Sequence, residues 1–354
     1  MTNLIVLLST IYLFVSGNAT LDDEGIRVYR FDTKTAETAY VSGVKGVANP
    51  TFLWVSKNGQ RIYAVGEKSA DEATANALSF DKKTGRLTLK NTQKTYAGAP
   101  CNIILTPRED YLYTANYSDG SITQYAVRKD GTLNDAELIP FTGKSIVGGR
   151  QDQSHLHAVN FTPDGRYLMA NDLGTDKIHV FPLQKSDGKP LDKFGAFDFP
   201  VKAGMGPRHL CWAPDGRKAY LVGELSGEVL TLSYEKGRFK EVQYVMADEN
   251  DGAGSGDIHI SPDGRFVYAS HRLKGDGVSI LAVQADGTLR KVGYQTTGIH
   301  PRNFTISPDG SYLLVACRDS NQVEIYSRNK ATGMLTDTGK RISMNQPMCL
   351  QWGK

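Results

Sequence analysis

The sequence predicts an all-β fold: a seven-bladed β-propeller with four short strands in each blade. Three observations predict it. A tight turn joins two strand-like runs six times, these turns lie about 46 to 55 residues apart, and Val, Ile, Tyr and Phe fill the runs. At roughly fifty residues per blade, 354 residues hold about seven blades. The six turns are Asn58-Gly59, Glu109-Asp110, Asp164-Gly165, Asp215-Gly216, Asp263-Gly264 and Asp309-Gly310.

The first element is an apolar run from Leu4 to Val15, which we interpret as a structural strand. The alternative is a secretory signal peptide cleaved after Ala19. Such a signal begins with basic residues, whereas the first basic residue here is Arg27. Cleavage would also remove a strand that the ring needs. We therefore expect a cytoplasmic protein, or a periplasmic one if the segment from Met1 to Ala19 is cleaved.

The remaining elements follow the repeat, which is clearest in the strand-like runs 303–307, 311–317 and 322–329. The last run, Gln346 to Trp352, resembles the opening strand of a blade, such as Ala99 to Leu105. The first residues supply what that blade lacks, with further strands at 25–31 and near Tyr40. The two chain ends would then share one blade, closing the ring and removing two exposed sheet edges. We expect one domain over 1–354.

The composition narrows the range of partners. The net charge is +3, and no block of five like charges exists, so we expect no nucleic-acid contact and no membrane patch. The four cysteines are far apart and form no metal-binding spacing, which favours buried free thiols. The oligomeric state is left open.

Candidate site residues gather at one end of the hairpins. Residues equidistant from a hairpin turn lie side by side, which pairs Arg208 with Glu224 and places Arg302 beside Cys317 and Arg318. When the same distances from the turn are applied to every blade, basic side chains lie together at one rim of the central channel, and five of the seven histidines are among them. A basic rim with one paired carboxylate suits a small anionic ligand. The set is His155, His157, Arg208, His209, Glu224, His271, Arg272, His300, Arg302 and Arg318.

Structural roles compete with these assignments. Arg208 and Glu224 could be an ion pair that ties two strands, His155 and His157 could cap backbone groups, and His271 could be an ordinary loop residue. Metal binding is disfavoured because few carboxylates accompany the histidines. The opposite end of each hairpin carries only turn residues.

The motifs resemble those of the seven-bladed propeller lactonase family, which includes bacterial 6-phosphogluconolactonases and fungal carboxymuconate lactonizing enzymes. The resemblance rests on His155-Leu156-His157, Gly206-Pro207-Arg208-His209, Gly223-Glu224-Leu225 and His300-Pro301-Arg302. It covers roughly 25–354. After the second strand of the fifth visible repeat, members of the family usually have the sequence Asn-Arg-Gly, whereas this chain has Ser270-His271-Arg272-Leu273.

The resemblance implies hydrolysis of 6-phospho-D-glucono-1,5-lactone, with no metal or organic cofactor. It places catalytic roles on His157, Arg208 and Glu224, and makes Arg272 a second basic residue. The phosphate would be held by Arg272, Arg302 or Arg318. Either Glu224 or His157 would be the general base; tight pairing with Arg208 would weaken Glu224 and favour His157. The alternatives are an enzyme acting on another anionic lactone and a propeller that binds a ligand without turnover.

Overall fold

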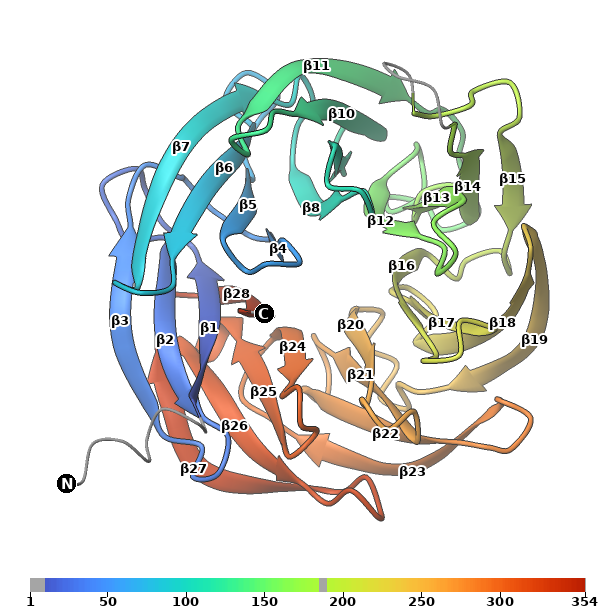
Figure 1. The fold of residues 1–354 in the computed structure, drawn as a ribbon. Coiled ribbons are helices and arrows are strands. Elements are labelled where there is room, and N and C mark those ends of the chain that lie inside the picture. The colour runs from blue at the N-terminus through green and yellow to red at the C-terminus, as the bar shows by residue number, and fades with distance from the viewer. Residues whose placement is uncertain (1–9, 185–189, 354) are drawn as a thin grey trace.

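Seven four-stranded antiparallel sheets form a closed ring in the computed structural model, which describes residues 10–184 and 190–353 (Figure 1). The predicted fold class is confirmed, because each sheet is one blade and the first strand of each blade faces the centre. Blade 1 contains β4 (Leu53–Val55), β5 (Arg61–Gly66), β6 (Thr74–Asp81) and β7 (Arg86–Lys94). Blade 2 contains β8 (Pro100–Leu105), β9 (Tyr111–Asn116), β10 (Ser121–Val127) and β11 (Leu133–Pro140).

Blades 3 to 6 repeat the pattern in chain order. Blade 3 contains β12 (Leu156–Phe161), β13 (Tyr167–Asp172), β14 (Lys177–Pro182) and β15 (Phe197–Pro200). Blade 4 contains β16 (Pro207–Trp212), β17 (Lys218–Gly223), β18 (Glu228–Glu235) and β19 (Arg238–Met246). Blade 5 contains β20 (Ser255–Ile260), β21 (Phe266–His271), β22 (Gly277–Val283) and β23 (Leu289–Thr296). Blade 6 contains β24 (Pro301–Ile306), β25 (Tyr312–Cys317), a 3-10 turn (Arg318–Ser320), β26 (Gln322–Arg328) and β27 (Leu335–Ser343).

Blade 7 joins the two ends of the chain, as the sequence predicts. It contains β28 (Pro347–Trp352), β1 (Thr10–Gly17), β2 (Ile26–Asp32) and β3 (Thr38–Val44) in that spatial order. Strand β1 pairs with β28 on one side and with β2 on the other, and Leu13, Phe14 and Val15 are fully buried. The part of the predicted first strand before Thr10 lies outside the described residues.

The hydrophobic core is divided among the seven contacts between neighbouring blades, each filled by its own cluster of buried side chains. The thiols of Cys101, Cys211, Cys317 and Cys349 are free, and all but Cys317 lie on central strands, as expected. No blade therefore has a core of its own, and the ring must be closed for the sheets to be buried.

An irregularity near the start of the central strand positions the site. In blades 2 to 7 the pairing between the first two strands shifts there, so the central strand carries one extra residue relative to its partner; in blade 5 two residues of the central strand lie opposite one. Such a bulge leaves a residue unpaired and redirects its side chain. The residues skipped by the pairing are Cys101, His157, Arg208, Gly256 with Asp257, Arg302 and Met348.

Candidate functional site

The basic residues reach the channel from two places in the repeat. His157, Arg208 and Arg302 are bulge residues of β12, β16 and β24. Glu224 and Arg272 directly follow the second strands β17 and β21. Because the bulge of a central strand lies beside the end of the second strand, these side chains meet at one rim. We call the group Arg150, His157, Arg208, Glu224, Arg272 and Arg302 the arginine cleft.

Arg208 contacts three other groups in and around the arginine cleft. Its Nη1 donates to Nε2 of His157 and also contacts Oε2 of Glu224. Its Nε donates to the backbone oxygen of Gly256 at 2.6 Å. Arg208 is 2% exposed, so a buried guanidinium links blades 3, 4 and 5 at the channel wall.

Glu224 is the carboxylate that the arginines share. Arg150 Nη2 donates to its Oε1 at 2.6 Å, and Arg272 Nη2 lies 3.6 Å from its Oε2. Burial disfavours the charged form, but the positive charges of Arg208, Arg272 and Arg150 prevail and lower the pKa of Glu224 to about 2. Glu224 is therefore ionised at neutral pH and is a weak base.

His157 is the base that this arrangement leaves available. Burial, the positive charge of Arg208 and the neighbouring His209 hold the pKa of His157 well below its usual value. The imidazole is therefore neutral at pH 7. Because Nε2 accepts a hydrogen bond from Arg208, its lone pair becomes free for a proton only when a substrate takes that guanidinium group.

Arg150 is a site residue that the sequence analysis missed. It lies between β11 and β12, outside the hairpin register, and its side chain is 36% exposed at the edge of the cleft. The spacing of the repeat does not predict the position of a residue in a connection between blades. Only the hydrogen bond from Arg150 to Glu224 in the structure identifies Arg150 as part of the cleft.

Arg302 has an unusual environment. Among the described residues it has no hydrogen bond or ion pair at contact distance, although it lines a small pocket together with Cys101, His157 and Arg208. Burial and the nearby charge of Arg208 lower the pKa of Arg302. Arg302 is half-buried, and its guanidinium has no counter-ion at contact distance in the described part of the chain, so it is available to an anionic ligand at this point.

His300 and Arg318 lie at the edge of the same group. Arg272 Nη1 donates to Nε2 of His300 at 3.1 Å, and Nδ1 of His300 lies 3.4 Å from Asp319. Arg318 forms a two-point ion pair with the same Asp319. The positive charge of Arg318 is thus partly neutralised, which makes it a weaker anion ligand than Arg302.

Three predicted histidines have ring partners outside the arginine cleft, although His209 also lines the small pocket of His157, Arg208 and Arg302. His155 stacks on Tyr117 and its Nδ1 lies 2.9 Å from the Tyr117 backbone oxygen. His271 is fully buried, with its two ring nitrogens against Ser255 and Ser279. Across the hairpin His271 pairs with Ser255, because the bulge in β20 leaves Gly256 and Asp257 outside the pairing.

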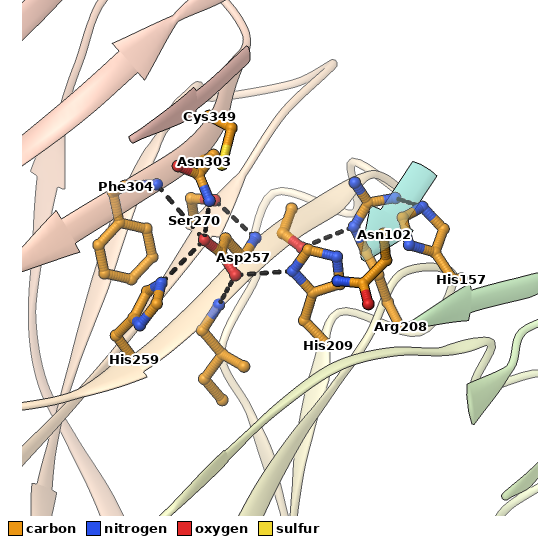
Figure 2. Close-up of polar contacts among 12 residues, drawn as sticks. Asn102, His157, Arg208, His209, Asp257, His259, Ser270, Asn303, Phe304 and Cys349 are labelled. Atoms are coloured by element: carbon orange, nitrogen blue, oxygen red, sulfur yellow. Dashed lines mark hydrogen bonds and ion pairs between the residues drawn. The ribbon is translucent and has the colours of Figure 1, made fainter. Parts of the chain in front are cut away.

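His209 is the third, and it reveals a group of residues that the sequence analysis did not anticipate. Its Nδ1 lies 2.7 Å from Asp257, whose other oxygen lies 2.9 Å from His259 (Figure 2). These residues line a second cavity toward the hairpin turns. The sequence analysis did not consider these side chains, which lie in the middle of the central strands.

Comparison with known proteins agrees with the fold and with these motifs. A model of the family described as "Lactonase, 7-bladed beta-propeller" matches residues 12–352. This chain belongs to the seven-bladed β-propeller lactonase family. The resemblance drawn from the motifs is thereby confirmed.

Individual family members are similar over nearly the whole chain. A crystal structure of a putative 6-phosphogluconolactonase from Bacteroides fragilis is 46% identical, with a TM-score of 0.93, and the match covers 97% of this chain and 98% of that one. A 6-phosphogluconolactonase from Formosa agariphila is 36% identical, over 92% of this chain and 95% of its own. A periplasmic gluconolactonase from Pseudomonas aeruginosa is 31% identical, with a TM-score of 0.90 and coverage of 98% and 99%.

Two further findings concern metals and membranes. Within residues 10–184 and 190–353, no group of three His, Cys, Asp or Glu side chains has the arrangement of a metal site. Over the same residues, no helix is long and apolar enough to cross a membrane.

Proposed function

We propose that this chain hydrolyses 6-phospho-D-glucono-1,5-lactone to 6-phosphogluconate, a reaction of the pentose phosphate pathway, in the arginine cleft. The observation that carries the proposal is the charge of the cleft: Arg302 has no counter-ion at contact distance among the described residues, and three more arginines share Glu224. Guanidinium groups bind phosphate and stabilise oxyanions. Family members named 6-phosphogluconolactonase support the same substrate.

The proposed reaction starts with a water molecule that attacks the lactone carbonyl carbon. His157 Nε2 accepts a proton from that water. The carbonyl oxygen becomes an oxyanion and takes the Nη1 hydrogen bond of Arg208, which frees the lone pair of His157 in the same step. The intermediate then expels the ring oxygen, which receives the proton from His157.

Glu224 has a positioning role in this scheme. A carboxylate with a pKa of about 2 is poorly suited to remove a proton at neutral pH. Its two oxygens instead hold Arg150, Arg208 and Arg272 at one point. The sequence left the general base open between Glu224 and His157. In this proposal His157 is the general base, and Glu224 positions the arginines.

Arg302 and Arg272 are the proposed phosphate ligands. Arg302 offers an unpaired guanidinium, whereas Arg272 is already bonded through Nε to Gly254 at 2.7 Å. Arg318 and His300 would supplement them at the edge. His155, His209 and His271 are left out of the proposed substrate site. Nδ1 of His155 lies against the Tyr117 backbone oxygen and Nδ1 of His209 against Asp257, and both ring nitrogens of His271 lie against serine hydroxyls.

The test is a lactonase assay, corrected for spontaneous ring opening, with 6-phosphogluconolactone and with glucono-1,5-lactone. We expect enzymatic hydrolysis of the phosphorylated lactone that is lost in Arg208→Ala and Glu224→Ala while the fold persists. Hydrolysis of the unphosphorylated lactone alone would reassign the substrate, in line with the Pseudomonas relative. Full activity in both variants would refute the proposed site.

We also propose a cytoplasmic location. Strand β1 is buried between β28 and β2, and cleavage after Ala19 would remove it from blade 7. Mass spectrometry of the protein purified from its native cells tests this proposal. A chain that starts at Thr20 would overturn it.

A further inference from the structure

Asp176 is a buried aspartate to which the proposed reaction gives no role. It lies in the loop between β13 and β14 and is 4% exposed. Its Oδ2 accepts hydrogen bonds from the hydroxyl group of Ser145 at 2.6 Å and from the backbone nitrogen of Gly204 at 2.7 Å. Its Oδ1 accepts from the backbone nitrogen of Gly206, also at 2.7 Å. One carboxylate therefore joins two distant segments of the chain.

The first of these segments carries Arg150 into the cleft. The backbone nitrogen of Ser145 donates to the Gln151 oxygen at 2.9 Å, which closes a loop that we call the Arg150 loop, residues 145–151. The side chain of Gln151 is fully buried and donates to the backbone oxygen of Leu173 at 2.7 Å. The loop is thus tied at both ends to the connection between β13 and β14, and Arg150 lies between the two ties.

The second segment, residues 204–206, leads into β16 and Arg208; we call it the glycine segment. Gly204 and Gly206 have φ angles of 80° and 64°, a region that favours glycine, and both donate their N–H groups to the same carboxylate. The backbone oxygen of Gly206 accepts from the backbone nitrogen of Glu224 at 2.8 Å. Gly206 therefore connects Asp176 to the backbone of Glu224.

The two segments bring their arginines to one carboxylate. Arg150 Nη2 donates to Oε1 of Glu224 at 2.6 Å, and Arg208 Nη1 contacts Oε2. Arg150 comes from the connection between blades 2 and 3, whereas Arg208 and Glu224 come from blade 4. Because Asp176 is bonded to both segments, it fixes the Arg150 loop relative to blade 4.

Hydrogen bonds to a carboxylate are roughly twice as strong as those between neutral groups, and three of them converge on Asp176. We propose that Asp176 is a positioning residue of the arginine cleft, which holds the two segments so that Arg150 and Arg208 meet the two oxygens of Glu224. Its effect on the rate of hydrolysis rests on the proposed function, whereas its effect on the two segments does not.

Asp176→Asn tests the inference at nearly constant side-chain size. The amide has one acceptor oxygen, so in either orientation its NH2 group faces the N–H group of Gly204 or that of Gly206. We expect faster amide hydrogen exchange in the Arg150 loop and the glycine segment of the substrate-free protein. We also expect kcat/KM for 6-phosphogluconolactone to fall at least about tenfold, since a displacement of about 1 Å can cost about 10²-fold.

Leu13→Ala is the control for lost stability alone. Leu13 is fully buried at the contact between blades 6 and 7. This variant should leave kcat/KM and the exchange of the two segments unchanged.

Ser145→Ala separates positioning from folding. It removes one bond of Asp176 and leaves both glycine bonds in place. We expect a loss of kcat/KM that disappears when Ser145→Ala is made in an Arg150→Met background, because the bond acts through Arg150. Thermal unfolding checks each variant; if Asp176→Asn does not fold, Ser145→Ala decides, by this cycle and by exchange of the Arg150 loop.

Two results would overturn the inference. One is unchanged exchange of both segments in Asp176→Asn, which would show that Asp176 does not hold them, whether or not the chain is a lactonase. The other is an equal loss from Ser145→Ala in both backgrounds, which would show that the bond does not act through Arg150. If the wild type hydrolyses no lactone, the proposed function is refuted, and the exchange measurement decides the inference on its own.

Discussion

Nη1 of Arg208 donates a hydrogen bond to Nε2 of His157, from β16 to the neighbouring β12. Each partner is the bulge residue of its strand. The bond places a positive charge and a neutral base at one point of the channel wall. This relationship leads to the first prediction.

Arg208→Lys should lower kcat for the phosphorylated lactone by roughly 10²- to 10³-fold, as removal of an oxyanion donor commonly does. Lysine keeps the charge but cannot hold Gly256, Glu224 and His157 at once. Steady-state kinetics checks this. A kcat within a factor of three of the wild type would show that the fixed guanidinium is not needed.

Glu224→Gln should destabilise the fold by about 3 to 5 kcal/mol, because it leaves several guanidinium groups near one point without a counter-charge. Urea unfolding measures the change. Glu37→Gln is the control, since Glu37 pairs with Lys340 at the surface with its side chain 71% exposed. Similar, small effects in both variants would contradict the prediction.

Arg302→Met should raise KM for 6-phosphogluconolactone and leave KM for glucono-1,5-lactone nearly unchanged. The same variant should be at least as stable as the wild type, because it removes a half-buried positive charge that has no partner within the described residues and lies near Arg208. Kinetics with both lactones and a thermal melt give the two readouts. Equal losses on both lactones would argue against a phosphate contact.

Stability should decrease as the pH falls below about 6.5. The pKa values of His157, His271 and His300 are lowered in the folded protein, to about 3 for the last two, so their contribution is complete above 6.5 and is lost on acidification. Glu224 adds a loss between about 4.5 and 2. The pKa of His209 is also lowered, which adds to the loss; His259, whose pKa is raised, acts in the opposite direction but is one group against four.

Chemical unfolding at several pH values between 4 and 8 checks this dependence. A free energy of unfolding that stays constant from pH 7 to pH 5 would contradict it. His271→Gln, which removes one of the buried imidazoles, should make the dependence shallower.

Leu13→Ala should cost about 2 to 5 kcal/mol, the usual range for a buried leucine in a packed core. Leu13 is fully buried in β1 and packs at the contact between blades 6 and 7. Leu21→Ala is the matched control, because Leu21 is 60% exposed a few residues later. A small loss in Leu13→Ala would mean that β1 contributes little to ring closure.

Much of the site was predictable because it lies on a repeat. The positions of His157, Arg208, Glu224, Arg272 and Arg302 follow from their distance to a hairpin turn, and the structure places them around one cleft. Their catalytic and binding roles stay predictions. Arg150 was missed because it lies in a connection between blades, where no register applies.

The sequence by itself determined the fold, the number of blades and the shared last blade, because period, turn chemistry and strand composition are local properties. Only the tertiary structure decided which partner each side chain meets. The bulges shift the register by a residue, and neighbouring blades supply the contacts. His209 therefore meets Asp257 of the next blade, whereas Arg208, one residue earlier, meets Glu224 in the cleft. Such contacts depend on the packing of separate sheets, which the local pattern of the sequence does not describe.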